Sequence, residues 1–380
     1  MPTFLHTADW QIGRQFSSLN PEHAAPLFEQ RIKVVERLAA LATQHRVAAV
    51  LVAGDVFDAQ TVSQRTIRRL FEALSGFAGP WLMIPGNHDA ALTESVWTRA
   101  QRLNAVPANA HLLLTPELRL FADLGFAVLP APLTQRHTYG DATEWFDHAA
   151  TPDGLLRIGL AHGSVQGVLA ADIDSANPIA ADRAVRARLD YLALGDWHGC
   201  KPIDDRTWYA GTPEPDRFRN NESGLALLVE LDAPGAAPRV TRVPTGHYRW
   251  QSLSAELRVG SDLDGLADQL AQLDAQQVVD LVVVGQIDLA GQRRLDDAIG
   301  RADARALLLQ SDLSGLRLQP TDDDIAALQA DGYVGEVIAE LRAASAFGDE
   351  AACTAQDALA LLAKELMQQA PVAANAQGGI

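Results

Sequence analysis

The stretch VAAVLVAGDVFD, residues 47–58, gives the clearest indication of the fold. Its first seven residues, 47–53, are all apolar, and a glycine and an aspartate follow at once. A short apolar run that ends at a glycine predicts a strand, of the kind found in the parallel sheets of α/β proteins. The polar residues GDVFD would then lie beyond the carboxyl end of that strand, where ligands bind in open α/β sheets.

The same arrangement recurs on both sides of this stretch. An apolar strand over residues 4–7 runs into ADWQ, and a strand over 81–84 runs into GNHD. Between these strands, apolar residues at helical spacing predict two helices, over residues 22–45 and 63–74. Strands that alternate with helices of this length indicate βαβ units and a mostly parallel sheet. The loops ADWQ, GDVFD and GNHD should therefore converge at one edge of it.

Later segments extend this first part of the chain. Strands are predicted over residues 156–161 and 191–194, and they end in the polar loops AHG and GDWHG. The segments WYAG, residues 208–211, and GLALLVEL, residues 224–231, are expected to be antiparallel strands that close the sheet.

The pattern changes at about residue 252 and indicates a small separate α/β domain. Its predicted elements are a helix over 263–273, a strand over 278–284, a helix over 292–299 and a strand over 306–308. The sequence TDDDIAALQ then begins with a helix-capping group, and amphipathic helices are expected to about residue 368. We therefore predict four parts: 1–250, 251–320, a helical segment 321–368 and a disordered tail 369–380.

Charge is distributed unevenly over the 380 residues, whose net charge is −17. Residues 1–250 hold 23 Lys and Arg against 27 Asp and Glu, whereas residues 251–380 hold 8 against 21. The excess of negative charge argues against tight unaided binding to a nucleic-acid backbone, which requires local basic charge. Binding through a few arginines, or together with a basic partner, stays open.

The sequence also bears on compartment and redox state. It shows no secretory signal pattern, and its apolar stretches are far shorter than the roughly 20 residues that span a bilayer. We expect a cytoplasmic protein, associated with the nucleoid if it acts on DNA, and no contact with a membrane. The two cysteines, Cys200 and Cys353, lack a CxxC pattern, so free thiols are expected.

The strand-end loops together supply side chains that bind metal ions, namely Asp9, Asp55, Asn87, His88, His162, Asp196 and His198. Carboxylate and amide oxygens mixed with imidazoles suit manganese, iron or zinc better than calcium. A carboxylate such as Asp55 can bridge two ions, and two ions about 3.5–4 Å apart promote in-line attack on phosphate. Alone, GDVFD reads as a capped turn and AHG as a buried histidine. Five such loops after five strands favour phosphoester hydrolysis.

The series Asp9, GDVFD, GNHD, AHG and GDWHG resembles the calcineurin-like metallophosphoesterases over about residues 1–220. Within that family, HTADWQIG, GDVFD and WYAGTPEPDRF are similar to the corresponding segments of SbcD-type DNA repair nucleases. The resemblance implies an α/β four-layer sandwich, a small α/β capping domain and a helical C-terminal segment. It further implies an exonuclease or endonuclease that acts on DNA with an SbcC-like ATPase of the SMC type, and it leaves a homodimer open.

The resemblance also assigns metal ligands for two divalent ions, manganese foremost and magnesium second. The first ion would be held by Asp9, Asp55 and His198, with Gln11 where the family has a histidine. The second would be held by Asp55, Asn87, His162 and Asp196, and Asp196 again replaces a family histidine. Aspartate at 196 keeps a good ligand and favours harder ions, whereas the neutral amide of Gln11 is a weaker ligand than imidazole.

Two further roles follow from the same resemblance. His88 corresponds to the residue that donates to the phosphate or the leaving oxygen, and Asp89 to its orienting neighbour. Arg217 and Arg219, just after GTPEP, are candidates for contact with DNA phosphates.

Three hypotheses remain: a DNA nuclease with an ATPase partner, a phosphoesterase for small substrates such as nucleotides or cyclic phosphodiesters, and a weakly active structural or regulatory subunit. Gln11 is the main support for the third.

Overall fold

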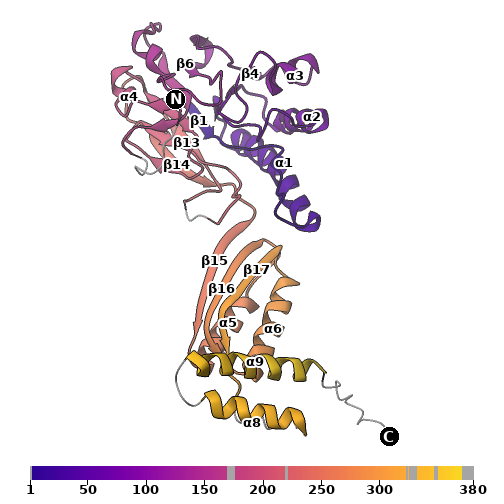
Figure 1. The fold of residues 1–380 in the computed structure, drawn as a ribbon. Helices are drawn as coiled ribbons and strands as arrows, with labels where there is room; N and C mark the ends of the chain where they lie inside the picture. The colour runs from indigo at the N-terminus through magenta and orange to yellow at the C-terminus, as the bar shows by residue number, and fades with distance from the viewer. Residues whose placement is uncertain are drawn as a thin grey trace. The chain divides into compact units, whose positions relative to one another are not determined.

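The computed structural model describes residues 2–168, 176–218, 221–321, 324, 332–345 and 350–369. The chain divides into two compact units, Met1–Arg249 and Trp250–Ile380 (Figure 1). Each unit is built around its own hydrophobic core, as its buried clusters show.

The first unit contains two six-stranded sheets. The first sheet has, in spatial order, the strands β14 (Arg239–Pro244), β13 (Leu225–Glu230), β1 (Thr3–Thr7), β2 (Ala49–Ala53), β3 (Trp81–Ile84) and β4 (Ala110–Leu112). Strands β1 to β4 are parallel to one another, and β13 is antiparallel to β1. The strands predicted over residues 4–7, 47–53 and 81–84 are thus confirmed as neighbours in one parallel sheet.

The second sheet has, in spatial order, the strands β11 (Lys201–Pro202), β12 (Thr207–Tyr209), β10 (Tyr191–Gly195), β7 (Leu156–His162), β6 (Phe126–Ala131) and β5 (Arg119–Phe121). A separate pair consists of β8 (Ser164–Val165) and β9 (Pro178–Ile179). The expectation that WYAG and GLALLVEL form antiparallel strands closing one sheet was wrong for WYAG. It contributes β12, which runs parallel to β10 in the second sheet, whereas GLALLVEL contributes β13 to the first.

The two sheets pack face to face because the side chains of each strand alternate between two apolar environments. In β2, Ala49 and Leu51 join the cluster shared by the two sheets, and Val50 and Val52 point to the helical side. That side is covered by α1 (Pro21–Gln44), α2 (Gln64–Ala73) and α3 (Val96–Arg102), visible in Figure 1. Complete burial of a valine or leucine side chain contributes roughly 1.5–3 kcal/mol.

The far side of the second sheet is covered by shorter elements. They are the 3-10 helix η3 (Glu144–His148) and α4 (Arg183–Arg186), whose Phe146 and Ala184 pack in one cluster with Leu192 and Leu194 of β10. The 3-10 helices η1 (Leu74–Gly76) and η2 (Ala122–Leu124) complete the unit. The order of layers is helices, sheet, sheet and helices, which confirms the predicted sandwich.

The second unit has a three-stranded sheet and four helices among its described residues. Its strands are β15 (Arg249–Leu257), β16 (Gln277–Ile287) and β17 (Leu308–Leu318), and its helices are α5 (Gly260–Ala271), α6 (Leu289–Asp303), α8 (Tyr333–Ser345) and α9 (Glu350–Gln369). Helices α5 and α6 share an apolar core with the sheet, and α8 packs on α9 through Ile338 and Leu359. The subdivision near residue 320 stays a prediction, and the predicted tail lies outside the described residues from 370 onward.

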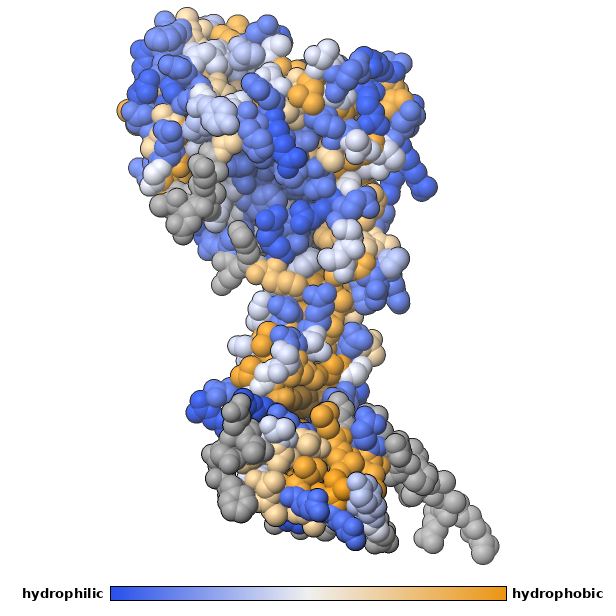
Figure 2. Space-filling model, in the orientation of Figure 1, coloured by the Kyte–Doolittle hydropathy of each residue, from blue (hydrophilic) through white to orange (hydrophobic). Residues whose placement is uncertain are grey.

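One face of the second unit's sheet carries exposed apolar side chains. Along β16, Leu281 and Val283 are buried in the core with α5 and α6, whereas Val282 and Val284 are exposed. Figure 2 shows hydrophobic residues gathered on the visible face of this unit.

Among the described residues, no helix combines the length and apolar character needed to cross a bilayer. Cys200 is a buried free thiol, and the side chain of Cys353 is not among those described.

Candidate metal centre

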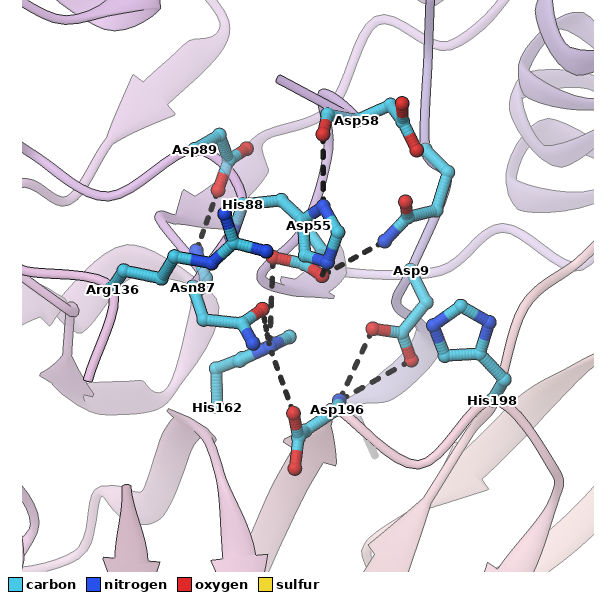
Figure 3. Close-up of polar contacts among 12 residues, drawn as sticks. Asp9, Asp55, Asp58, Asn87, His88, Asp89, Arg136, His162, Asp196 and His198 are labelled. Carbon is cyan, nitrogen blue, oxygen red and sulfur yellow. Dashed lines mark hydrogen bonds and ion pairs between the residues drawn. The ribbon is translucent and has the colours of Figure 1, made fainter. Parts of the chain in front are cut away.

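The polar residues predicted from the strand-end loops come together at one edge of the first unit. Asp9, Asp55 and Asn87 follow β1, β2 and β3 of the first sheet. His162 ends β7, and Asp196 follows β10, in the second sheet. Because the carboxyl ends of these parallel strands meet at the same edge, the side chains from both sheets converge there, as Figure 3 shows.

The backbone at these loops is left-handed at several residues that are not glycine. The φ angles are 54° at Asp9, 52° at Gln11, 52° at Asp55 and 102° at Asp196. Such conformations cost on the order of 1–3 kcal/mol each and cluster at functional sites. The two loops hold each other, since the amide of Asp9 donates to Gly54 O at 3.1 Å and that of Gln11 to Asp55 O at 3.0 Å.

Glycines in the motifs permit the close approach of these loops. A Cβ atom at Gly54 would lie 2.3 Å from His162 Nδ1, and one at Gly86 would lie 2.3 Å from Asp55 Oδ1. Both distances are far below contact distance. The glycines of GDVFD and GNHD are therefore required because the side chains of His162 and Asp55 occupy the space that a Cβ would need.

Three buried residues form the tightest group of potential ligands. The ligand atoms of Asp9, Asp55 and His162 all lie within 4.8 Å of one another. His162 Nδ1 lies 2.8 Å from Ala53 O, and since a carbonyl only accepts, Nδ1–H donates to it. Its Nε2 therefore faces the centre, which is the arrangement of a metal-binding histidine whose other nitrogen is held by the protein.

Oxygen atoms surround His162 Nε2 on several sides. Asn87 Oδ1 lies at 3.3 Å, Asp55 Oδ1 at 3.6 Å and Asp196 Oδ1 at 3.7 Å. One imidazole nitrogen with carboxylate and amide oxygens is a donor set that suits manganese or magnesium. These residues fit a divalent cation.

The electrostatics of the centre lead to the same conclusion. Burial raises the pKa of Asp9 to about 6 and that of Asp89 to about 7, with Asp55 adding to both shifts. Burial alone would lower the pKa of His162, but the charges of Asp55, Asp196 and Asp9 raise it to about 9. Without a cation the centre therefore retains protons, which a divalent ion would displace on binding.

Gln11 is buried and its amide is only half satisfied. Its Nε2 donates to Asp55 Oδ2 at 2.8 Å, and its Oε1 has no hydrogen-bond partner among the described residues. A buried polar atom without a partner costs about 1–3 kcal/mol. The amide nitrogen thus engages one of the principal carboxylates, and the oxygen can turn toward a cation only if that hydrogen bond breaks.

The loop after β10 brings Asp196 and His198 to the centre. The amide of Asp196 donates to Asp9 Oδ1 at 3.1 Å and lies 3.3 Å from its Oδ2, so this loop is tied to the loop after β1. His198 opposes the effect of burial on the pKa of Asp9 and lies near it in Figure 3. It does not belong to the tightest group of three.

The sequence pattern gave no indication of a role for Asp216, although its segment TPEPDRF contributes to the family resemblance. Its carboxylate lies 3.2 Å from Arg31, which is equally buried, and 3.0 Å from Arg14. Burial alone would raise the pKa of Asp216, but His198, Arg31 and Arg217 hold it well below its ordinary value. Asp216 is thus an ionised buried carboxylate directly behind a candidate metal ligand.

Of the two arginines predicted to contact DNA, the structure describes only Arg217. Arg217 pairs with Asp216 at 2.9 Å and donates to His198 Nδ1 at 2.9 Å, so the structure places it behind the centre. Arg219 lies outside the described residues. Contact with DNA stays a prediction for both.

His88 and Asp89 occupy different environments. The His88 side chain is 32% exposed, its Nδ1–H donates to Asp58 O at 2.8 Å, and its Nε2 lies 3.9 Å from Asp55 Oδ2. The carboxylate of Asp89 is buried and accepts from the amides of Phe57 at 3.0 Å and Gly86 at 2.7 Å. Asp89 therefore braces the GDVFD and GNHD loops, and the contact that orients the His88 ring comes from the carbonyl of Asp58.

Comparison with known proteins agrees with this geometry. Residues 2–229 match the family model of the calcineurin-like phosphoesterases. The chain belongs to this family. A relative from Rhodobacter capsulatus, the SbcD subunit of the nuclease SbcCD, is 42% identical over 293 residues, which cover 63% of this chain and 69% of that protein.

Two further relatives of this phosphoesterase carry the same name. The Bacillus subtilis protein is 26% identical over 337 residues, covering 77% of this chain and 82% of its own length. The Escherichia coli K12 protein is 35% identical over 262 residues, which cover 60% of this chain and 64% of that protein. The chain is an SbcD-type calcineurin-like phosphoesterase, a family that depends on divalent metal ions.

Proposed function

We propose that the chain is a metal-dependent nuclease that hydrolyses phosphodiester bonds of DNA during repair. The observation that carries the proposal is the grouping of Asp9, Asp55 and His162 at the meeting edge of two sheets, with Asn87 and Asp196 beside them. The names of the relatives support a nucleic acid as the substrate, because all three are subunits of a nuclease.

Two divalent ions, manganese foremost, are proposed to bind at this centre. Asp9, His198 and the oxygen of Gln11 would hold one ion, and Asn87, His162 and Asp196 the other, with Asp55 shared between them. When bound, such ions supply a nucleophile from water at neutral pH and offset the charge of the phosphate oxygens. Most of the residues proposed to hold these ions lie deep in the fold, so their positions are set by the packing of the two sheets.

His88 is proposed to act on the leaving group. Water adds to phosphorus and loses a proton to solvent, the bond from phosphorus to the 3′ oxygen breaks, and the departing oxygen takes a proton from His88 Nε2, which solvent then restores. The ring is suited to this role because Asp58 O fixes its other nitrogen, the side chain is partly exposed, and Nε2 lies 3.9 Å from Asp55 Oδ2, on the side of the proposed metal ligands. The products are a 5′ nucleotide and a free 3′ hydroxyl.

The partners are also part of the proposal. The relatives are named as one component of the nuclease SbcCD, so an SbcC-like ATPase is the expected partner, and a homodimer is a second assembly to test. The exposed Val282 and Val284 of β16 offer apolar surface of the kind that protein partners bury. A cytoplasmic location at the nucleoid follows from DNA as the substrate.

One observation favours a second candidate, a regulatory subunit with little activity of its own. The amide of Gln11 donates to Asp55 and so occupies an oxygen that a bridging carboxylate needs for its ions. If this contact persists, the first ion would bind weakly and the subunit would serve mainly to control its ATPase partner.

The three functions can be separated in one assay. Purified protein is incubated with manganese and either linear duplex DNA, single-stranded DNA or bis-p-nitrophenyl phosphate. Asp55→Asn serves as the control for the metal centre, and Arg46→Gln, an exposed residue before β2, as the control for substitution itself. Cleavage of DNA by wild type but not by Asp55→Asn supports the nuclease. Turnover of the small ester with intact DNA supports a small-substrate enzyme, and turnover of neither substrate contradicts both enzymatic functions.

A further inference from the structure

Arg136 is an exposed residue in the segment between β6 and η3, and neither the motifs nor the comparisons assign it a role. Figure 3 shows its side chain extending toward the group that contains Asp55, Asn87 and His88. Its guanidinium has no hydrogen bond or ion pair with any described residue. An arginine directed toward a group of carboxylates without pairing with any of them is available to an anionic ligand.

The segment that carries Arg136 is fixed to the GNHD loop on one side. Leu133, three residues earlier, accepts from the amide of Ala91 at 2.8 Å and donates to Pro85 O at 3.3 Å. Pro85 and Ala91 lie directly before and shortly after GNHD. The backbone leading to Arg136 is therefore hydrogen-bonded to both ends of the loop that carries Asn87 and His88.

On its other side the segment is fixed through Asn177. The Asn177 side chain donates to Arg136 O at 3.2 Å and accepts from the amide of Thr138 at 2.8 Å. The carbonyl of Asn177 in turn accepts from the amide of Ser164 at 2.9 Å, two residues after His162. The backbone around Arg136 is thus held between the loop of Asn87 and the strand end of His162, beside the candidate metal centre.

The other arginines near the centre already have partners. Arg14, Arg31 and Arg217 each pair with the single carboxylate of Asp216. Arg31 is almost completely buried and cannot reach a substrate. Among these arginines in the described part of the chain, Arg136 alone is both exposed and without a carboxylate partner.

We propose that Arg136 binds a non-bridging oxygen of the phosphodiester that the metal centre hydrolyses. A guanidinium offers two parallel N–H donors to a phosphate, which gives orientation as well as charge. The carboxylates of the centre repel a phosphodiester, so a guanidinium that extends toward His88 helps to place the substrate there. This inference rests on the proposed function and names the residue that positions its substrate.

The test compares Arg136→Gln, Arg136→Lys and Arg46→Gln. Arg46 is a matched control because it is exposed, has no described ion pair and precedes β2, at the opposite end of the strand from the centre. Steady-state hydrolysis of bis-p-nitrophenyl phosphate with manganese gives kcat/KM, and calorimetry gives the manganese affinity. Binding of a labelled DNA duplex to calcium-loaded protein is measured over a range of salt concentrations, with a gel to verify that the duplex stays intact.

We expect Arg136→Gln to lower kcat/KM by roughly 10- to 100-fold, as loss of a charged hydrogen bond implies, with unchanged manganese affinity. Arg136→Lys should recover part of the loss, and Arg46→Gln should match wild type. The slope of log affinity against log salt should fall by about 0.9 in Arg136→Gln, which corresponds to one phosphate contact. An active wild type with an equally active Arg136→Gln overturns the inference, as does an unchanged salt slope. An inactive wild type overturns the proposed function instead, and the salt slope still tests Arg136.

Discussion

Substitution of Gln11 by histidine should tighten the weaker of two manganese-binding events. In the structure the Gln11 amide nitrogen donates to Asp55 Oδ2 at 2.8 Å. Nitrogen and oxygen share one planar amide, so turning the oxygen toward a cation breaks this bond. Histidine at position 11 offers a nitrogen lone pair and has no such bond to lose.

The magnitude follows from the strength of the bond that must break. A hydrogen bond to a charged group is worth about 1.5–3 kcal/mol, and each 1.4 kcal/mol is about tenfold in affinity. Gln11→His should therefore bind manganese at the weaker position about 10- to 150-fold more tightly than wild type. The stronger position, which relies on His162, should change little.

Calorimetric titration of manganese into EDTA-treated protein measures both events. Gln15→His is the matched control, because Gln15 lies in the same loop but is exposed and its amide donates to Gly13 O. Equal affinities in wild type and Gln11→His, with both proteins folded, would show that the Gln11 amide does not compete with the cation.

Three further substitutions test other contacts. Burial lowers the pKa of His6 from 6.5 to about 3, so as the pH decreases the unfolded chain binds a proton at this histidine before the folded chain does. The free energy of unfolding should therefore fall as the pH decreases. Between pH 7 and 5, urea denaturation in EDTA should show wild type losing about 2 kcal/mol more than His6→Gln. Asp216→Ala should lower the unfolding free energy by about 3–5 kcal/mol, because buried Arg31 loses its partner, and added Arg31→Met should recover part of it. Gly86→Ala should weaken manganese binding in calorimetry, because its Cβ would meet Asp55 Oδ1 at 2.3 Å, whereas Gly140→Ala, in open space, should not.

The sequence predicted the elements that carry strong local patterns. The apolar strand predicted over residues 47–53 is β2 at the centre of the first sheet, and the helix predicted over 22–45 is α1. Strands such as β5, with three residues and no clear alternation, gave no comparable signal. WYAG was assigned to the wrong sheet because its partner β10 is set by packing, which a sequence pattern does not encode.

The sequence predicted the part of the candidate site that lies at strand ends. Asp9, Asp55 and His162 each follow an apolar strand, and parallel topology brings such positions together. Asp216 and Arg136 lie in loops without a strand pattern, and their positions depend on contacts with segments far away in the chain. The role of Asp58 was hidden as well, because its backbone carbonyl rather than its side chain orients His88.

A manganese titration of EDTA-treated protein, with linear duplex DNA as substrate, tests most directly whether the chain is a metal-dependent nuclease. We expect no cleavage without metal, cleavage that rises with manganese in wild type, and none in Asp55→Asn at any manganese concentration. Cleavage by wild type in EDTA, or equal cleavage by Asp55→Asn, would contradict a metal centre built on Asp55.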